Sequence, residues 1–305
     1  MGSSLPSEGH RSDASVDVFL HIPKTGGSTL RTLLYEEYEG ALLKVSYRKE
    51  GRTLPQLVGD LRSITPEQWN GHRLVFGHVG FGIHREIPRP VTYFTLVRHP
   101  VDRLMSQYLH SRRTADAAHH DAAVSYSLVE CLRRGLVPRW INPLVWTLSE
   151  AQWQMEMGER GDEPCDEASL AEATRNLDAF AVVGLTERYD MSVAAMRSVL
   201  GWQQATYTTS NVGETPAWRR DPELRRELAS LVELDLRLYE TATQRFEQQW
   251  AENEAAFEDA MATTRWRQRR HMWWVTAERK WRAVRMVASA DGRRRKARRA
   301  ARPAA

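Results

Sequence analysis

A short turn near the N-terminus places a lysine, two glycines and hydroxyl side chains next to one another. Residues 19–34 read FLHIPKTGGSTLRTLL, in which the apolar run 16–22 predicts a buried strand and the leucines after Thr29 recur at helical spacing. The unpaired amides of a helix start favour an anion, which Gly26 and Gly27 would allow to approach the backbone. With Lys24 as a point charge, the turn predicts a site for a phosphate-like group.

The order of residues in this turn argues against the nucleotide-triphosphate P-loop. That motif requires a glycine, four residues and then Gly-Lys-Ser/Thr, whereas here Lys24 precedes the glycines and no upstream glycine stands at the required distance. A nucleotide-dependent kinase of a small molecule is therefore only the alternative interpretation. A glycine-rich turn without any ligand is the structural alternative.

A second anion site is predicted by RHPVDRLMSQYLH, residues 98–110. The β-prone run 91–97 ends at Arg98, and Pro100 stands where a first helical turn would begin. Ser106 follows Arg98 by eight residues, about two turns into that helix. A guanidinium and a hydroxyl placed in this way suit a second phosphate, although a helix cap with a surface arginine would give the same pattern. Two anion sites in one crevice favour a ligand phosphorylated at both ends.

A histidine in the segment FGHVGFG supplies a candidate base. His78 follows the short strand 74–76, and Lys24 and Arg98 also lie just beyond strand ends. Ligands bind beyond the carboxyl ends of the strands in open parallel sheets, so we expect these three segments to converge on one crevice. An imidazole titrates near neutral pH and can take a proton from a hydroxyl group. We interpret the rival histidines as structural or surface residues: His21, His84, His99 and His110.

Strands that alternate with helices must position these residues. The runs 16–22, 41–46, 74–76, 91–97 and 180–183 predict an α/β fold, P-loop-like, with an open, mainly parallel sheet flanked by helices. A mostly helical insertion on the acceptor side is expected over residues 111–167, and C-terminal helices include one that opens at Asp221-Pro222 and runs past Tyr239. We expect a disordered lead-in over 1–15, a main domain over 16–260 and a basic Trp/Arg-rich helix and tail over 261–305.

Composition narrows the class of protein. Two cysteines, Cys131 and Cys165, give neither a disulfide framework nor a metal-ligand cluster, so we expect no metal. The polar lead-in lacks the apolar stretch of a signal peptide, and we expect the protein in the cytoplasm. The chain has a net charge of +4, but residues 265–302 contain 15 Lys and Arg against two acidic residues, which leaves the main domain acidic.

The basic tail leaves three interpretations open. Trp266, Trp273 and Trp281 fall on one helical stripe surrounded by arginines. Such a helix can pack on the main domain, lie on an anionic membrane surface as a peripheral contact through residues 265–302, or touch nucleic acid. Binding to nucleic acid as the whole function would leave the three strand-end sites unexplained, so nucleic acid is not the partner that we expect. A protein that binds membrane or nucleic acid through this tail is a further alternative interpretation.

The motifs together carry a resemblance to a known family. HIPKTGGSTL resembles the 5′-phosphosulfate loop, and RHPVDRLMSQYLH resembles the 3′-phosphate element, of sulfotransferases that use 3′-phosphoadenosine 5′-phosphosulfate (PAPS). FGHVGF is similar to the Gly-His segment of the carbohydrate branch, sulfotransferase family 2, that contains the heparan and dermatan uronyl 2-O-sulfotransferases. GLTERYDMSVAAMRSVLGW and NVGETP also fit that branch, so the likeness spans residues 16–239.

The resemblance implies a role for each matched residue. Arg98 and Ser106 would hold the 3′-phosphate of PAPS, His78 would be the catalytic base, and Lys24 would stabilise the leaving oxygen. The acceptor would be a hydroxyl of a saccharide, glycolipid or glycosylated small molecule. The tryptophans of the insertion would either stack on sugar faces or belong to the core. The residues placed around the 5′-phosphosulfate are Lys24, Thr25, Gly26, Gly27, Ser28 and Thr29.

Overall fold

The computed structural model describes residues 15–45, 51–203 and 216–264. The predicted lead-in before residue 15, most of the NVGETP segment and the whole of 265–302 lie outside these ranges. The expectations for the lead-in and for the basic tail therefore stay predictions.

Five parallel strands form one sheet in the order β2-β3-β1-β4-β5. The strands are β1 (Val16–Leu20), β2 (Leu42–Val45), β3 (Leu74–Gly77), β4 (Val91–Val97) and β5 (Phe180–Leu185). Every residue of β1, β3, β4 and β5 is buried, as expected for parallel strands covered on both faces. The predicted α/β fold is confirmed, and all strands end at the same edge of the sheet.

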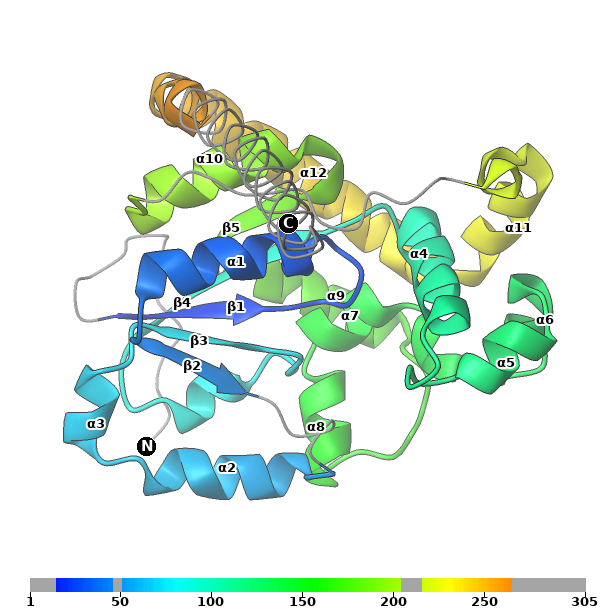
Figure 1. Ribbon diagram of the computed structural model, residues 1–305, viewed down its shortest axis with the longest axis horizontal. Helices are drawn as coiled ribbons and strands as arrows, with labels where there is room; N and C mark the ends of the chain where they lie inside the picture. The colour runs from blue at the N-terminus through cyan, green and yellow to red at the C-terminus, as the bar shows by residue number, and fades with distance from the viewer. Residues whose placement is uncertain (1–14, 46–50, 204–215, 265–305) are drawn as a thin grey trace, which may run out of the picture.

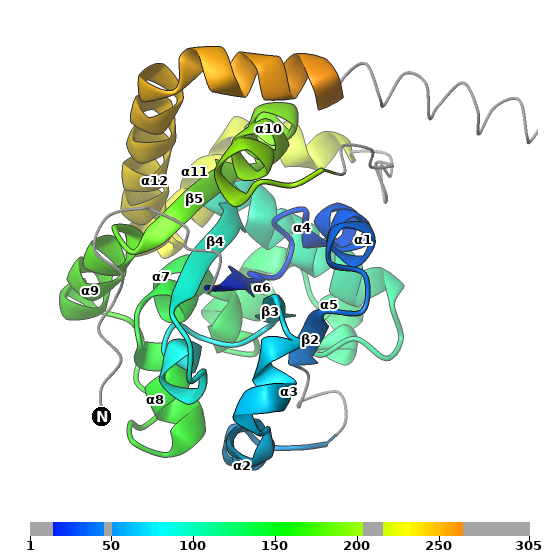
Figure 2. The same ribbon diagram turned by 90° about the vertical axis from the view of Figure 1, so that its left-hand side faces the viewer.

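Helices cover both faces of the sheet (Figure 1). Figure 2 shows α1 on one side of the strands and α7, α8 and α9 on the other. The first half of the chain contributes α1 (Gly27–Tyr38), α2 (Leu54–Ser63), α3 (Pro66–Asn70), α4 (Pro100–Arg113), α5 (His120–Ser125) and α6 (Leu128–Arg133). The second half contributes α7 (Pro143–Leu148), α8 (Ala151–Met157), α9 (Glu167–Leu177), α10 (Tyr189–Leu200), α11 (Pro222–Leu231) and α12 (Glu233–Glu252).

A second core lies beside the sheet. One face of α4, with Val101, Leu104 and Met105, packs against residues of α5, α6 and α11, and these helices form a lobe at the right of Figure 1. Because α4 also follows β4 directly, it connects this lobe to the strand-end edge of the sheet. The lobe therefore shares its central helix with the predicted second anion site.

The predicted single helix from Asp221 past Tyr239 is wrong. The chain leaves helical geometry at Val232 (φ −125°, ψ 35°), which separates α11 from α12. Leu228 and Val232 are buried in the second core, whereas Leu238 is buried in the core around the sheet. The break at Val232 therefore lies where the chain passes from the second core toward the core around the sheet.

Residues 111–167 are mostly helical, as predicted, and their tryptophans belong to the core, whereas their place on the acceptor side stays a prediction. Residues 111–167 complete α4, form α5 to α8 and reach the start of α9. Trp140, Trp146 and Trp153 are 4%, 6% and 2% exposed. Side chains buried to this degree do not present a face to a sugar, so of the two alternatives the structure supports the core.

A buried carboxylate fastens α12 to α7. Asp235, fully buried, accepts hydrogen bonds from the amides of Leu144 (3.1 Å) and Val145 (2.9 Å). Burial raises the pKa of Asp235 to about 6, although the charge of Arg103 lowers it. Arg103 on α4 is equally buried and donates to the carbonyl oxygen of Trp140 at 2.6 Å. Arg103 thereby joins α4 to the segment before α7, while Asp235 joins α12 to α7 itself.

Candidate active site

The turn after β1 has the backbone geometry of an anion-binding helix start. Gly26 is the N-cap of α1 with φ 90°, and Lys24 adopts a positive φ of 71°. The fully buried Thr25 hydroxyl donates to the carbonyl oxygen of Ile22 at 2.9 Å, which closes the turn. The amides of Thr29 and Leu30 donate to the carbonyl oxygen of the N-cap Gly26. The two amides before them, at the very start of α1, have no carbonyl one turn earlier within the helix to bind. The sequence prediction of a strand, a glycine turn and a helix is therefore confirmed.

Gly27, the first residue of α1, lies against a histidine. A Cβ atom at this position would be 2.0 Å from Nε2 of His21. Any larger residue would therefore displace the imidazole, so the glycine at this position is explained without an anion at the turn. This contact also places the His21 ring directly at the N-terminus of α1.

Two imidazole rings stack at the strand-end edge. The rings of His21 and His78 are parallel to within 27°, with centroids 4.3 Å apart. Nδ1 of His78 lies 2.7 Å from the carbonyl oxygen of His21. Because a carbonyl oxygen only accepts, Nδ1 carries the proton, and Nε2 is the nitrogen of the neutral ring that can accept one. His78 is an exposed residue, so it lies at the surface of this edge.

His21 differs from His78 in its environment. Burial lowers the pKa of His21 well below its ordinary value, and the nearby charges of His78, Arg31 and Lys24 lower it further. The ring of His21 is therefore neutral at physiological pH. It orients His78 through stacking and through its carbonyl group.

Arg98 connects the two predicted anion sites. Its Nη1 donates to the carbonyl oxygen of Lys24 at 3.2 Å. Burial lowers the pKa of Lys24, followed by the charges of Arg98 and Arg113. Burial also lowers the pKa of Arg98, followed by the charge of Arg219, while Glu187 and Asp102 oppose this effect. Burial and neighbouring positive charges disfavour the charged forms of Lys24 and Arg98, and a bound anion would stabilise those charged forms. Ser106, half-buried on α4, lies two turns beyond Arg98.

A segment after β5 supports the turn, and the sequence reasoning missed it. Oγ1 of Thr186 lies 2.7 Å from the carbonyl oxygen of Thr25 and 2.9 Å from that of Val97. The hydroxyl of Tyr189 reaches the carbonyl oxygen of Gly26 at 3.4 Å. These residues belong to GLTERYD, which follows a predicted strand as Lys24 and Arg98 do. The same strand-end rule would have identified them.

Glu187, the next residue along, ties this segment to α4 and α12. Its Oε1 accepts from the amide of His99 at 2.9 Å, and its Oε2 accepts from the hydroxyl of Tyr239 at 3.0 Å. The carboxylate lies close enough to Arg98 to raise that residue's pKa against the lowering effect of burial. Glu187 therefore helps to hold Arg98 at the strand-end edge.

The glycines next to His78 pack against α8. A Cβ atom on Gly80 would be 2.9 Å from Cβ of Gln152, and one on Gly82 would be 2.7 Å from Cγ of Trp153. Nε2 of Gln152 also donates to the carbonyl oxygen of His78 at 3.4 Å. These glycines let α8 approach the loop, and Gln152 of α8 binds the backbone of His78.

The rival acid–base groups are engaged elsewhere. Glu86, which lies near the His78 loop in the sequence, accepts from Nε and Nη2 of Arg62 at 2.6 and 2.9 Å. His84 is 8% exposed, and its Nδ1 lies 2.8 Å from the hydroxyl of Tyr93. Nδ1 of His99 lies 3.7 Å from Asp102. His78 is thus the exposed member of the histidine pair beside the Lys24 turn.

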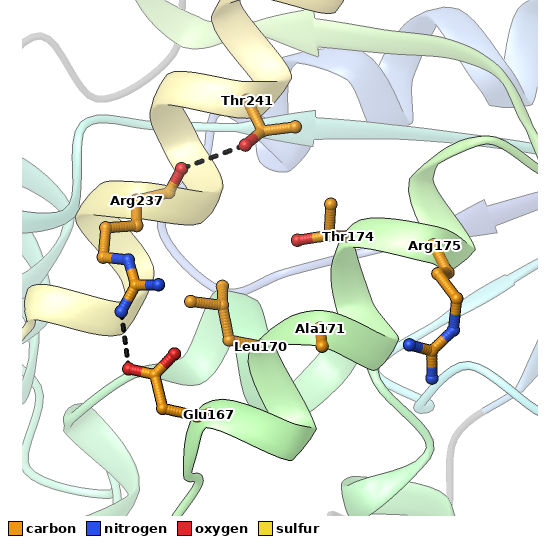
Figure 3. A pocket seen from close by; sticks show the side chains of 7 residues that line it. All are labelled: Glu167, Leu170, Ala171, Thr174, Arg175, Arg237 and Thr241. Carbon is orange, nitrogen blue, oxygen red and sulfur yellow. Dashed lines mark hydrogen bonds and ion pairs between the residues drawn. The ribbon is translucent and has the colours of Figure 1, made fainter.

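A groove of about 410 Å³ lies elsewhere, between α9 and α12 (Figure 3). Arg237 pairs with Glu167 across it at 2.5 Å, and the hydroxyl of Thr241 donates to the carbonyl oxygen of Arg237 at 3.2 Å. The residues that line the groove are Glu167, Leu170, Ala171, Thr174, Arg175, Arg237 and Thr241. None of them belongs to the strand-end segments, so the groove is separate from the candidate site.

Two further features concern residues 15–45, 51–203 and 216–264 only. Among them, no three His, Cys, Asp or Glu side chains gather as the ligands of a metal ion would. No helix within the same ranges combines the length and apolarity that crossing a membrane requires.

The comparison with known protein families agrees with this geometry. The model of the sulfotransferase family matches residues 12–241, which is more than half of the chain and includes the turn after β1, His78, Arg98 and Glu187. No curated protein matches the sequence. The family match does not distinguish the uronyl 2-O-sulfotransferase branch from others. The chain belongs to the sulfotransferase family and is a sulfotransferase enzyme, in a family whose general sulfate donor is PAPS.

Proposed function

We propose that this protein transfers the sulfuryl group of PAPS to a hydroxyl group of a saccharide-containing acceptor, with His78 as the general base. The observation that carries the proposal is the convergence of three strand ends. Arg98 binds the backbone of Lys24, and His78 binds the backbone of His21 three residues earlier. A base and two cations therefore meet at one edge of the sheet.

The residues at this edge fit the two charged ends of the donor. The turn Lys24 to Thr29 would hold the 5′-phosphosulfate, with backbone amides supplied by the α1 N-terminus and a positive charge by Lys24. Arg98 and Ser106 would hold the 3′-phosphate. The lowered pKa values of Lys24 and Arg98 support this assignment. Burial is the main cause of both, and a bound dianion would also offset the charge of Arg98 on Lys24 and the charge of Arg219 on Arg98. When bound, PAPS supplies an activated sulfuryl group.

His78 would act directly on the acceptor. As the acceptor oxygen bonds to sulfur, Nε2 of His78 takes the hydroxyl proton, while the bond between sulfur and the bridging phosphate oxygen breaks. The hydrogen bond from Nδ1 to the His21 carbonyl fixes the required tautomer, and the stacked ring of His21 holds the imidazole plane. Positioning and charge stabilisation carry most of such a transfer.

Lys24 would stabilise the negative charge that develops on the departing phosphate oxygen. Lys24 is a half-buried residue, and a charge interacts more strongly at a partly buried position than in water. Burial and the neighbouring guanidiniums lower its pKa, and an approaching anion would stabilise its protonated, positively charged form. This role makes Lys24 both a donor-binding and a catalytic residue.

The acceptor class rests on the resemblance of FGHVGF to the uronyl 2-O-sulfotransferases. The exposure of His78 is compatible with a bulky saccharide, a glycolipid or a glycosylated small molecule. Peripheral contact with an anionic membrane through residues 265–302 remains a further proposal for how the enzyme would meet a lipid-linked acceptor in the cytoplasm.

A transfer assay with ³⁵S-labelled PAPS tests this proposal. Wild-type protein and the His78→Ala variant would be incubated with panels of saccharides, glycolipids and glycosylated small molecules. We expect label to appear on at least one saccharide-containing acceptor with the wild type and to be almost absent with the variant. Phosphate transfer from γ-labelled ATP in place of sulfuryl transfer would support the kinase alternative and overturn the proposal.

A further inference from the structure

An acidic residue lies next to the predicted 3′-phosphate site. Asp102 stands in the first turn of α4, four residues after Arg98, and is half-buried. Its two carboxylate oxygens bind Nη1 and Nη2 of Arg225 at 2.9 and 3.2 Å, and Nη2 of Arg219 lies 3.5 Å from Oδ1. The pKa of Asp102 is lowered although burial alone would raise it, because Arg225 stabilises the charged form.

The two arginines reach Asp102 from a distant part of the chain. Arg219 lies in the short helix η5 (Ala217–Arg220), and Arg225 lies in α11. Nη1 of Arg225 also donates to the carbonyl oxygen of Arg219 at 3.3 Å. Asp102 thus fastens the segment that follows residue 215 to the start of α4.

Not every N–H group of the Arg219 guanidinium is used in these contacts. Its side chain is 15% exposed, and its buried Nε has no hydrogen-bond partner among the described residues. Its contact with Asp102 is long, whereas Arg225 binds both carboxylate oxygens. Asp102 therefore neutralises Arg225 more completely than Arg219.

The positive charge of Arg98 is also incompletely neutralised by its neighbours. Glu187, the other carboxylate in this region, accepts hydrogen bonds from His99 and Tyr239. After burial, the charge of Arg219 is the next cause of the lowered pKa of Arg98, which places the two guanidiniums in each other's field. Two neighbouring, incompletely paired guanidiniums suit a phosphate dianion.

We propose that Arg219 is a second guanidinium for the 3′-phosphate of the donor, beside Arg98, and that Asp102 is the residue that positions it. This inference rests on the proposed function and deepens it, since the 3′-phosphate distinguishes PAPS from ordinary adenine nucleotides. The segment after residue 215 would then complete the nucleotide site that β1 and β4 begin.

The positioning role proposed for Asp102 can be distinguished by experiment from the repulsion between its carboxylate and the phosphate. A carboxylate beside a phosphate site repels the phosphate, so by charge alone the Asp102→Asn change should strengthen binding of a 3′-phosphorylated nucleotide. If Asp102 positions Arg219, the same change should weaken that binding. The two accounts therefore predict opposite signs.

The test is calorimetric binding of adenosine 3′,5′-bisphosphate and adenosine 5′-monophosphate to the full-length protein. We expect Arg219→Ala to weaken binding of the bisphosphate about ten- to a hundredfold, the usual cost of a charge-assisted contact, with little change for the monophosphate. Arg220→Ala is the matched control, because Arg220 lies in the same short helix but is exposed, and it should leave both affinities within about twofold of wild type. Arg219→Lys should retain part of the preference, and Asp102→Asn should lose part of it.

The monophosphate also serves as the control for folding, since a variant that is misfolded would lose both nucleotides alike. A preference for the bisphosphate that is unchanged in Arg219→Ala, or strengthened in Asp102→Asn, would overturn the inference. If the wild type itself shows no preference, the proposed donor site is wrong and this inference is wrong with it. If the preference depends on Arg98 but not on Arg219, only the inference fails.

Discussion

Two glycine-rich loops lie at the same edge of the sheet and use their glycines differently. After β1, Gly26 has φ 90° at the N-cap of α1, and Gly27 makes room for the His21 imidazole. After β3, Gly80 and Gly82 make room for α8, which packs directly on the loop. The first loop thus leads into the start of a helix, where we propose that an anion binds, and the second packs against α8 next to His78.

This difference shows that a glycine in a sequence indicates a close approach without indicating what approaches. In both loops the nearest neighbour is another part of this chain. The two loops should therefore respond differently to mutation. Changes in the β1 loop should affect nucleotide binding, whereas changes in the β3 loop should affect turnover at His78 and stability at its glycines.

The largest effect is expected at His78 in the β3 loop. His78→Ala should lower turnover by about 10² to 10⁴, the usual contribution of a general base, while binding of adenosine 3′,5′-bisphosphate stays nearly unchanged. Steady-state rates and calorimetry on the same protein would check this. If turnover were retained, another group would have to be the general base. A parallel loss of nucleotide binding would show that His78 supports the β1 loop.

Substitution of Lys24 in the β1 loop should weaken nucleotide binding. Lys24→Ala should weaken both adenosine 3′,5′-bisphosphate and adenosine 5′-monophosphate about ten- to a hundredfold, because both carry the 5′-phosphate. Lys44→Ala is the matched control, since Lys44 is an exposed lysine on the edge strand β2. A Lys24 variant that loses affinity for the bisphosphate alone would contradict the assignment of this loop to the 5′ end.

Substitution of Gly82 should lower the stability of the fold without changing nucleotide binding. Gly82→Ala combines a φ of 126° with a Cβ atom 2.7 Å from the Trp153 ring, so we expect it to lower the free energy of unfolding by about 1 to 3 kcal/mol. Gly59→Ala in α2 meets no atom within 4 Å and should be neutral or slightly stabilising. Urea unfolding would compare the two variants. Equal stabilities would contradict the tight packing of the β3 loop on α8.

The smallest effect is a pH dependence that originates at His21. Its pKa in the folded protein is lowered, so below about pH 6.5 the unfolded chain binds a proton that the folded protein does not, and stability falls as the pH falls. His21→Phe keeps a stacking ring but cannot titrate, so it should lose less stability between pH 7.5 and 5.5. The difference should approach about 1.4 kcal/mol per pH unit below pH 6.5.

The comparison between wild type and His21→Phe removes the contribution of Asp235, which both proteins share. Burial raises the pKa of Asp235 to about 6, so its own contribution to stability falls as the pH rises through that value and has the opposite sign. Denaturant unfolding at both pH values would check the difference. Identical acid sensitivity in the two proteins would show that His21 is not held neutral.

Much of this architecture could be predicted because its signals are contiguous. The turn after β1 contains its strand, its glycines and its helix within one stretch, and Arg98 and Ser106 share another. The contacts of Asp102 with Arg219 and Arg225 could not be predicted, since the chain brings them together over more than a hundred residues. The break at Val232 was missed because the apolar residues on both sides of it keep helical spacing, and the spacing does not reveal that they belong to two cores.

The central claim is that this edge of the sheet binds a nucleotide phosphorylated at both its 5′ and 3′ ends. Calorimetric titration of wild type and Arg98→Ala with adenosine 3′,5′-bisphosphate and adenosine 5′-monophosphate tests it most directly. We predict that the wild type binds the bisphosphate at least about tenfold more tightly and that Arg98→Ala abolishes most of this preference, because one charge-assisted contact is lost. Equal affinities of the wild type for the two nucleotides would contradict the claim.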